Sequence, residues 1–293
     1  MAIELGYAPS FLTIDVPLPL PQEGHVVRQL DYTHFTVLLD PFRRLAAATG
    51  VNIDGAALVD LDRTNDWRFD PRVPESEQAG PRLYEQNDLD RGHLVRRRDP
   101  VWGAPEIAAR ANSETFMFTN AAPQAKKFNQ GPELWAGLEN YVLDHARVHR
   151  AQLNVFTGPV FDPTDPIYRD IAIPRLFWKI AVWVHVPANV DLNADDSVEG
   201  LVLAATGYVL DQTAQLDDLD LQTARALEAG DTPPLGPFRT FQVPIADIAA
   251  LTGFDLRQLV DADRLPTPAV PGAVGHAGRA LWVLLTTGED ITL

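Results

Sequence analysis

The sequence predicts an α+β fold in which a mixed or antiparallel central sheet is flanked by helices. Strand-like and helix-like segments follow one another without the strict β-α-β alternation that a doubly wound parallel sheet requires. Several segments are short apolar runs bounded by turn residues, which indicates buried strands, while others repeat apolar residues at helical spacing. The chain has 293 residues, 46% of them hydrophobic, so it is long enough to bury a substantial core in one domain.

The first elements predicted are two strands with a short helix between them. Residues 28–38 and 51–61 alternate apolar and polar side chains and are rich in β-branched residues, as strands are. The segment between them starts with Asp40 followed by proline and ends with Gly50, which predicts a short helix. Residues 63–88 are polar and show no periodicity, so we expect a long surface loop, and loops of that length are often functional.

The rest of the chain predicts further helices and buried strands. The expected elements are, in order, a helix from residue 105, a short strand at 116–119, a helix at 132–150, strands at 152–161, 177–186 and 200–210, and a short helix at 243–253. We interpret residues 1–27 as an irregular, proline-rich lead and residues 28–293 as a single domain.

The composition excludes several kinds of site. The chain has no cysteine, which rules out disulfides, thiolate metal ligands and a cysteine nucleophile, so any metal must bind oxygen or histidine ligands. The N-terminus lacks the basic start and the unbroken apolar core of a secretory leader, and no window is long and apolar enough to span a membrane. We therefore expect no membrane partner, and either a cytoplasmic location or export without a cleaved leader.

Charge is distributed unevenly along the chain. The formal net charge is −16, which is the wrong sign for a protein that binds polyanions over its whole surface. Residues 91–150 nevertheless carry nine Lys or Arg against six Asp or Glu, whereas residues 191–293 carry five against sixteen. Positive charge is thus concentrated in the middle of the chain. The run from Arg96 to Arg98 is either part of a phosphate-binding groove or a solvated face.

Two neighbouring stretches have the density of reactive residue types that is expected of an active site. They contain DRGH at residues 90–93, N-x-x-P-Q at residues 120–124, and FNQ followed by W and LE within residues 128–139. This pattern resembles the DNA/RNA non-specific endonucleases, which include secreted bacterial nucleases and mitochondrial endonuclease G. The resemblance covers roughly residues 28–290, with weaker similarity in GPVF, IPRLFWKIAV and VPIADIAALTGFDL. It implies a ββα-metal (His-Me finger) motif and a metal-dependent, sugar-non-specific endonuclease that acts on DNA and RNA.

The chemistry of such a motif can be stated without the family. Hydrolysis of a phosphodiester needs an activated water, stabilisation of charge on the phosphoryl oxygens and discharge of the leaving 3′-oxygen. His93 can activate the water, because an unperturbed imidazole titrates near neutral pH. Its other ring nitrogen should then donate to a fixed acceptor, for which we expect a backbone carbonyl near Phe116 or Met117. Gly92 should allow a tight turn beside the histidine, and the two residues before it should anchor the loop.

A divalent ion suits the two remaining tasks. Mg²⁺ keeps several waters and accepts few protein ligands, so one neutral amide oxygen is enough to hold it. The resemblance implies that Asn129 supplies this oxygen and that Glu139 holds a metal-bound water, with Mn²⁺ as a substitute ion. Without the resemblance, Asn129 is better explained as an N-cap of the following helix. The resemblance also implies that Asn120 lies at the substrate phosphate, although an asparagine before Pro123 is equally typical of a turn.

Several basic residues are expected to contact the substrate. The resemblance implies Arg63 as a phosphate-binding catalytic arginine, with Arg68 as a competitor for that role, because a planar guanidinium suits bidentate contact with phosphate. The family's helix often carries an arginine one turn after the glutamate, where this chain has Leu143, and Arg147 follows one turn later. The substrate-binding residues expected are Arg91, Arg96, Arg97, Lys126 and Arg147.

Other functions stay open at this point. The same chemistry would serve a nuclease toxin or defence effector that a partner protein controls. A non-catalytic nucleic-acid-binding module is disfavoured, because His93, Asn129 and Glu139 are all intact. A phosphatase or phosphodiesterase for small molecules would not need the basic cluster at residues 91–98. The partners expected are DNA and RNA, with a homodimer and an inhibitor or immunity protein left open.

Overall fold

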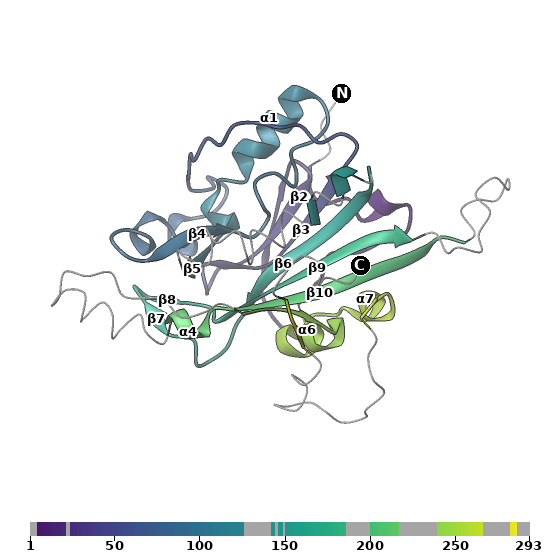
Figure 1. Cartoon of the computed structure of the whole chain (residues 1–293). Coiled ribbons are helices and arrows are strands. Elements are labelled where there is room, and N and C mark those ends of the chain that lie inside the picture. The colour runs from purple at the N-terminus through teal and green to yellow at the C-terminus, as the bar shows by residue number, and fades with distance from the viewer. Residues whose placement is uncertain are drawn as a thin grey trace.

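The computed structural model describes residues 5–21, 24–125, 142–143, 146–148, 150–185, 200–216, 239–265 and 282–285. Within these residues, eight strands form one antiparallel sheet in the order β1-β2-β3-β6-β9-β10-β11-β12 (Figure 1). The strands are β1 (Arg28–Tyr32), β2 (Phe35–Asp40), β3 (Leu45–Asp54), β6 (Gln152–Val160), β9 (Leu176–His185), β10 (Val202–Asp211), β11 (Arg239–Val243) and β12 (Val283–Leu284). The predicted α+β class with an antiparallel central sheet is confirmed.

The chain leaves the sheet between β3 and β6, and this excursion carries most of the expected site residues. It contains β4 (Leu89–His93) and β5 (Ala121–Ala125), which pair antiparallel with each other. Between them lie α1 (Pro105–Glu114) and the 3₁₀ turn η4 (Phe118–Asn120). Two further 3₁₀ turns, η2 (Glu75–Glu77) and η3 (Pro81–Leu83), interrupt the long loop before β4, which otherwise is as irregular as predicted.

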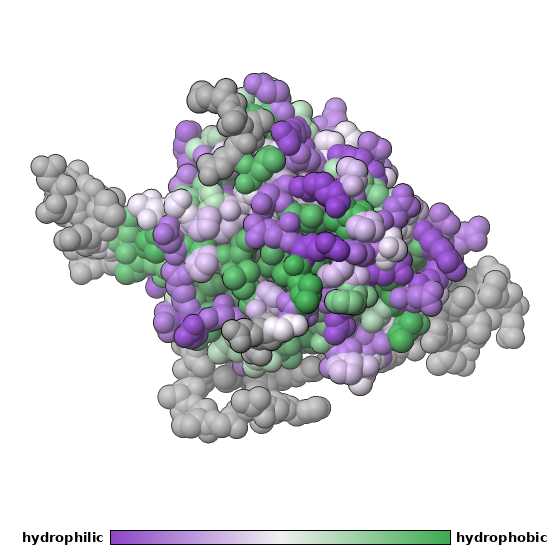
Figure 2. Space-filling view, turned by 180° about the vertical axis from the view of Figure 1, so that it is seen from behind, coloured by the Kyte–Doolittle hydropathy of each residue, from purple (hydrophilic) through white to green (hydrophobic). Residues whose placement is uncertain are grey.

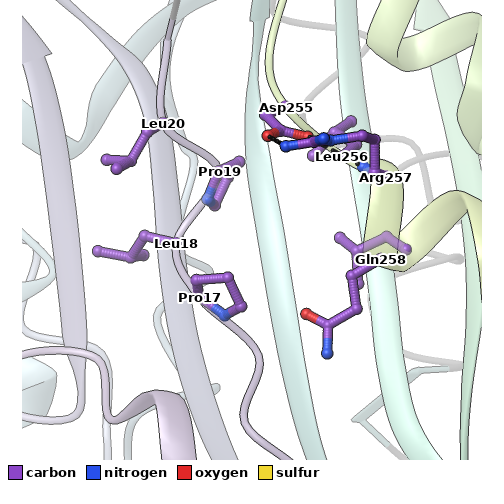
Figure 3. Close-up of a pocket in the computed structure, with 9 residues that line it drawn as sticks. Pro17, Leu18, Pro19, Leu20, Asp255, Leu256, Arg257 and Gln258 are labelled. Atoms are coloured by element: carbon purple, nitrogen blue, oxygen red, sulfur yellow. Dashed lines mark hydrogen bonds and ion pairs between the residues drawn. The ribbon is translucent and has the colours of Figure 1, made fainter.

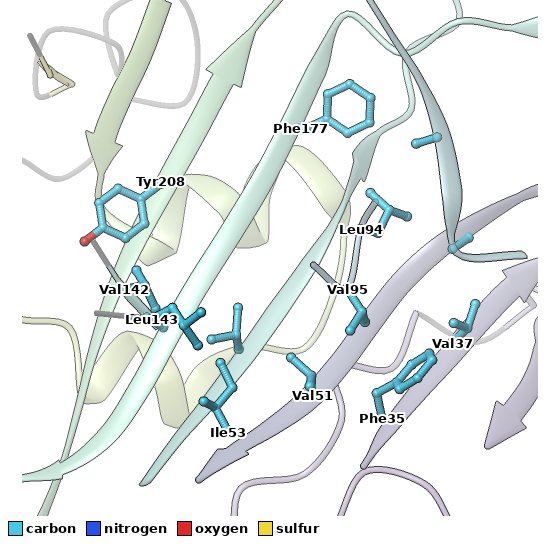
Figure 4. Packing of buried hydrophobic residues seen from close by; sticks show 14 of the residues in the cluster. Phe35, Val37, Val51, Ile53, Leu94, Val95, Val142, Leu143, Phe177 and Tyr208 are labelled. Atoms are coloured by element: carbon cyan, nitrogen blue, oxygen red, sulfur yellow. The ribbon is translucent and has the colours of Figure 1, made fainter. Parts of the chain in front are cut away.

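Hydrophobic clusters cover both faces of the sheet. On one face, Leu94 and Val95, which follow β4, pack in the same cluster as Val51 and Phe177 from the sheet (Figure 4). On the other face, α6 (Ile245–Thr252) and α7 (Arg257–Asp261) pack against the strands. The sheet therefore lies between a layer with β4, β5 and α1 and a layer with α6 and α7 (Figure 1). Small elements complete the described fold, namely η1 (Pro9–Leu12), β7 (Ile167–Tyr168), β8 (Ile171–Ala172) and α4 (Thr213–Leu216).

The N-terminal segment packs on the face that carries α6 and α7. Its Tyr7 hydroxyl donates to the Val16 carbonyl at 2.7 Å and accepts from the Asn154 amide of β6 at 2.7 Å. Residues 17–20 face residues 255–259 across a cavity of about 360 Å³ (Figure 3). Beside this cavity, the Gln258 amide donates to the Asp15 carbonyl at 2.8 Å. These contacts join the start of the chain to its C-terminal helices.

The helix predicted between residues 40 and 50 is wrong. Asp40 ends β2, and its side chain accepts the backbone N–H groups of Phe42 and Arg43 at 2.9 Å each. Arg44 has a positive φ of 63° and donates its own N–H to the Asp40 carbonyl at 2.8 Å. The Asp-Pro pair therefore starts a tight turn between two strands. The alanines that follow belong to β3, since they are buried on both faces of the sheet, where an unbroken run of apolar residues is expected.

The strand predicted at residues 116–119 is also wrong. The Arg68 N–H donates to the Phe116 carbonyl at 3.0 Å, and the Phe118 N–H donates to the Arg68 carbonyl at 2.9 Å. This single bridge to the preceding loop satisfies the backbone of the segment, which then enters η4 instead of a sheet. The helix from residue 105, the strands near residues 152, 177 and 200, and the helix near residue 245 are confirmed. Of the helix predicted at 132–150, the described positions 142–143 and 146–148 are helical, and position 150 is a turn with a positive φ of 51°. The other positions lie outside the described residues.

The surface carries scattered hydrophobic side chains. Figure 2 shows hydrophobic residues gathered among hydrophilic ones on the face turned away from the viewer of Figure 1. Phe42, Val148 and Ile167 are the most exposed large hydrophobic residues of the described part. Within that part, none of the helices combines the length and the hydropathy needed to cross a membrane.

We predict that Gln212→Ala destabilises the fold by about 2–4 kcal/mol, because it leaves buried backbone groups without partners. Gln212 is fully buried, accepts the Ala125 N–H at 2.9 Å and donates to the Pro174 carbonyl at 2.6 Å, so it ties β5 to the central sheet. Chemical unfolding followed by circular dichroism measures the change. Gln258→Ala is the matched control, since this exposed amide makes one carbonyl contact and should cost less than about 1 kcal/mol. Equal effects for the two variants would contradict the prediction.

Candidate active site

His93 is the last residue of β4, and the pairing with β5 sets its position. His93 lies opposite Ala121, and Asp90 lies opposite Gln124. Beyond the strand, the Leu94 N–H donates to the Asn120 carbonyl at 3.0 Å, so the pairing continues one step past the histidine. The segment after His93 then turns into the core through Leu94 and Val95, which are both buried. His93 is therefore held from both sides by ordered backbone.

Asn120 holds the backbone around His93. Its side chain is fully buried and accepts the Val95 N–H at 2.8 Å. The same amide donates to the Val95 carbonyl at 2.9 Å and to the Thr115 carbonyl at 3.0 Å. The predicted contact between Asn120 and a substrate phosphate does not fit this arrangement, because both amide atoms are engaged and none of the side chain is exposed. The structure gives Asn120 a positioning role.

Aromatic side chains surround the imidazole of His93. Its ring centroid lies 4.6 Å from that of Trp67 and 5.0 Å from that of Phe116, which meets it edge to face. The His93 Nε2 atom is buried and has no hydrogen-bond partner within the described residues. In the described part, the acceptor predicted near Phe116 or Met117 does not bond to this atom. The Phe116 carbonyl accepts from the Arg68 N–H and the Met117 carbonyl from the Asn120 N–H. An aromatic wall takes the place of that acceptor.

The surroundings of His93 disfavour its charged form. Burial, and after it the positive charges of Arg63, Arg97 and Arg96, lower the pKa of His93 from 6.5 to about 3. Burial acts because it removes the solvation of an imidazolium, and like charges add to the same effect. The residue is thus neutral throughout the physiological range, whereas the sequence suggested a titration near neutral pH.

The two arginines that competed for the phosphate-binding role lie in different surroundings. Arg63 is exposed, and its charge is the first of those that act on His93. Arg68 donates to the Ser113 hydroxyl of α1 at 3.0 Å and lies 3.9 Å from the Asp66 carboxylate. Arg63 is therefore the arginine of this loop whose charge reaches the imidazole, while Arg68 attaches the loop to α1.

Other basic residues make contacts within the protein. The Arg97 guanidinium donates to the Leu61 carbonyl at 2.8 Å and to the Asn112 amide oxygen of α1 at 3.2 Å. Arg98 and Arg147 share the exposed carboxylate of Asp60, which Arg147 contacts at 2.5 Å. These side chains hold the segment before Arg63 against its neighbours, so their predicted contact with substrate competes with contacts that are already made.

A tight turn had been predicted as the reason for Gly92. The glycine is instead required because there is no space for a side chain at this position. It lies inside β4, and a Cβ atom there would come within 2.1 Å of the Gln124 side chain on β5. Gln124 is fully buried, and neither atom of its amide has a hydrogen-bond partner within the described part. The neighbouring Arg91 lies 5.8 Å from the ring centroid of Tyr84, so it packs on the inner side of the preceding loop.

The expected metal ligands lie outside the described residues. This holds for Asn129, for Glu139 and for the substrate-binding Lys126. In the part that is described, no group of three or more His, Asp and Glu side chains could hold a metal ion. Cationic side chains act on His93 from the described side of the site. An amide oxygen and a carboxylate are the kinds of donor that suit a hard divalent ion.

Two features of the site were missed from the sequence. Trp67 lies in the loop that was predicted to be functional, but an aromatic residue in a polar loop that also holds Phe69 and Tyr84 gave no sign that it would reach His93. Asp60 was likewise taken as part of a strand. The cavity beside residues 17–20 is on the opposite face of the sheet from β4 and holds none of the residues discussed for catalysis.

Comparisons with known proteins agree with this picture. The uncharacterised protein y4fB of Sinorhizobium fredii is 38% identical over 303 residues, which cover 94% of this chain and 41% of that protein. The salivary endonuclease of Lutzomyia longipalpis is 33% identical over 106 residues, 32% of this chain and 23% of that protein. The chain thus spans less than half the length of either curated relative.

A solved structure shares the fold. The crystal structure of the EndoG/EndoGI complex, described as the mechanism of EndoG inhibition, matches with a TM-score of 0.56 at 18% identity. The match covers 82% of this chain and 91% of that one. The model of the family described as DNA/RNA non-specific endonuclease matches residues 19–263. With the histidine of DRGH held at the end of β4 and a family match over most of its length, this chain belongs to the DNA/RNA non-specific endonucleases.

Proposed function

We propose that the protein is a metal-dependent endonuclease that hydrolyses phosphodiester bonds of DNA and RNA without sugar specificity, with His93 as general base. The observation that carries the proposal is the protonation state of His93. Its imidazole, at the end of β4, is kept neutral by burial and by positive charge that includes the exposed Arg63 guanidinium. A neutral imidazole can accept a proton from water, and a guanidinium can bind the phosphate that the water attacks. Membership of the nuclease family supports the same assignment.

We assign Nδ1 of His93 as the basic atom. Nε2 is buried in the aromatic surroundings, so it cannot reach a water beside the substrate. With the ring proton on Nε2, the lone pair on Nδ1 takes the proton of the attacking water. The hydroxide equivalent attacks phosphorus, the bond to the 3′-oxygen breaks with its electron pair, and the 3′-oxygen takes a proton from solvent to become a hydroxyl. Asn120 and the pairing of β4 with β5 keep the ring in place through this step.

Arg63 binds the phosphate in this proposal. Its positive charge lowers the pKa of His93 in the free protein, so an anion bound to it would raise that pKa again. The base therefore becomes stronger once the phosphate is present. Arg96 and Arg97 act on His93 in the same direction, so they contribute to this coupling even where their own hydrogen bonds lie within the protein.

The metal ion in the proposal is Mg²⁺, with Mn²⁺ as a substitute. By resemblance to the family, Asn129 would hold it directly and Glu139 through water. When bound, the ion would supply stabilisation of negative charge on the phosphoryl oxygens and on the leaving 3′-oxygen. The residues of this chain bind and orient the phosphate and move the proton.

We predict that Asn129→Ala abolishes cleavage of plasmid DNA and of total RNA without changing the fold, because one protein ligand carries the metal. Cleavage by the unaltered protein should require Mg²⁺ or Mn²⁺ and stop with EDTA. Gel assays with circular dichroism measure both. Gln258→Ala, which removes an exposed amide on the opposite face of the sheet, is the matched control and should leave cleavage unchanged. Wild-type activity of Asn129→Ala at limiting Mg²⁺ would remove the ligand assignment.

We predict that His93→Ala lowers turnover by roughly two to four orders of magnitude, the usual effect of losing a positioned general base. In the unaltered protein, kcat/KM should stay level from pH 8 down to about pH 5, because it reports the free protein and the pKa of His93 there is about 3. The acid limb of kcat should lie at higher pH, since it reports the complex with bound phosphate. Steady-state kinetics on a short duplex measure both profiles. A fall of kcat/KM with an apparent pKa near 6.5 would contradict the neutral-base assignment.

We predict that Arg63→Gln and Arg68→Gln have different effects. Arg63→Gln should raise KM, reduce the salt dependence of cleavage and raise the pKa of His93, since it removes a positive charge that acts on the imidazole. Arg68→Gln removes the same charge from the same loop but breaks the contact with Ser113, so it should lower stability more than it changes KM. Cleavage at several salt concentrations, with thermal unfolding, separates the two. The reverse pattern would give the phosphate-binding role to Arg68.

A further inference from the structure

Trp67 forms the outer wall of the aromatic surroundings of His93. Its ring centroid lies 4.6 Å from the imidazole, with 48° between the ring planes, and 5.4 Å from Phe116, which it meets edge to face. It also lies 5.9 Å from Phe118. Phe116 and Phe118 are buried, whereas Trp67 and His93 are each half-buried. Of these three rings, Trp67 is thus the one that reaches solvent.

The backbone fixes Trp67 in this place. The next residue, Arg68, exchanges two hydrogen bonds with the segment that carries the other two rings: its N–H donates to the Phe116 carbonyl at 3.0 Å, and its carbonyl accepts the Phe118 N–H at 2.9 Å. The Arg68 side chain adds the contact with Ser113 on α1. Trp67 is therefore attached to the inner wall of the site, although it belongs to a long loop.

We propose that Trp67 is a positioning residue that fixes the ring of His93 against Phe116 and keeps water from its Nε2 side. The proposal rests on the proposed role of His93 as general base. It goes further by making the loop before β4 responsible for which nitrogen of the imidazole meets water. With Nε2 enclosed by Trp67 and Phe116, Nδ1 is the nitrogen through which the base acts.

The charged groups around His93 all disfavour its protonation. Arg63 acts from the same loop as Trp67, and Arg96 and Arg97 act from the segment after β4. The carboxylates near Trp67 in the sequence have other partners, since Asp62 acts on Arg97, Asp66 pairs with Arg68 and Asp70 pairs with Arg72. Removal of Trp67 would let water solvate the imidazolium, while these arginines stay in place. The pKa of His93 should then rise but remain below 6.5.

The test measures the protonation of His93 directly in purified, full-length variants. Long-range ¹H–¹⁵N NMR spectra, assigned with His93→Ala, give the pKa and the tautomer of the ring without any need for activity. Trp67→Ala should raise the pKa by at least about one unit, a tenfold change in proton affinity, and should reduce the dominance of the tautomer with hydrogen on Nε2. Trp67→Phe should restore the low pKa to within about half a unit, because a smaller aromatic ring still covers the imidazole.

Trp102→Ala is the matched control. Trp102 also stacks on a histidine, with its ring 3.5 Å from that of His34, and it lies outside the site, so its removal should leave the pKa of His93 unchanged. If Trp67→Ala does not fold, Trp67→Leu takes its place and should raise the pKa by at least about half a unit, since it covers less of the imidazole.

The pH dependence of activity provides a second measurement, which a merely structural effect of the substitution would not change. The ratio of kcat/KM for Trp67→Ala to that of the unaltered protein should fall at least about twofold from pH 8 to pH 4, because the base becomes protonated earlier. A simple loss of stability would lower this ratio equally at each pH. An unchanged pKa in Trp67→Ala, or a rise in KM alone, would overturn the proposal and make Trp67 a substrate-stacking residue or a packing residue.

The proposed function and the proposed role of Trp67 can be refuted separately. If His93→Ala retains full activity, the proposed function is wrong, and the NMR titration still decides whether Trp67 encloses the imidazole. If His93→Ala is inactive while Trp67→Ala leaves the titration and tautomer of His93 as they were, the role of His93 stands and the role of Trp67 is refuted.

Discussion

One buried amide, that of Asn120, joins the segments that surround His93. The side-chain amide of Asn120 pairs with both backbone groups of Val95 after β4 and with the carbonyl of Thr115 after α1. The backbone carbonyl of Asn120 accepts from the Leu94 N–H. A buried backbone group that lacks a partner costs free energy comparable to a lost hydrogen bond, so these segments can take few other arrangements. The direction of the imidazole follows from this constraint. In the mechanism we propose, a base held in this way is already positioned before substrate binds.

The electrostatics of the site couple phosphate binding to the strength of the base. Burial and three arginines keep His93 neutral in the free protein, which is the state that can accept a proton. A base with so low a pKa has little affinity for that proton. A bound phosphate supplies negative charge next to the same arginines, so the imidazole gains proton affinity when a target is present. In the mechanism we propose, the arginines therefore set the basicity of His93 as well as the position of the phosphate.

The parts that could be predicted from sequence are those with a strong local signal. The strands with continuous apolar runs and α1 were found because periodicity and turn residues mark them. The Asp-Pro pair at residues 40–41 was misleading, since such a pair is found at the start of tight turns and at the start of helices. Only the pairing between β2 and β3 shows that it starts a turn here. Asn120 and Gly92 were recognised as important, but for other reasons. Their roles depend on Val95, Thr115 and Gln124, which come into contact only in the folded chain.

The basic residues 96–98, which follow His93, also contribute to holding a neighbouring segment in place. Arg97 holds the Leu61 carbonyl, and Arg98 shares Asp60 with Arg147, so all three support the segment that leads to Arg63 and Trp67. Exposed ion pairs of this kind contribute little stability, typically about 1 kcal/mol or less. Their effect is to place a loop. In the function we propose, the chain's net charge of −16 makes long-range attraction of nucleic acid weak, so substrate capture would depend on short-range contacts. The precise placement of that loop then matters more than the total of positive charge around the site.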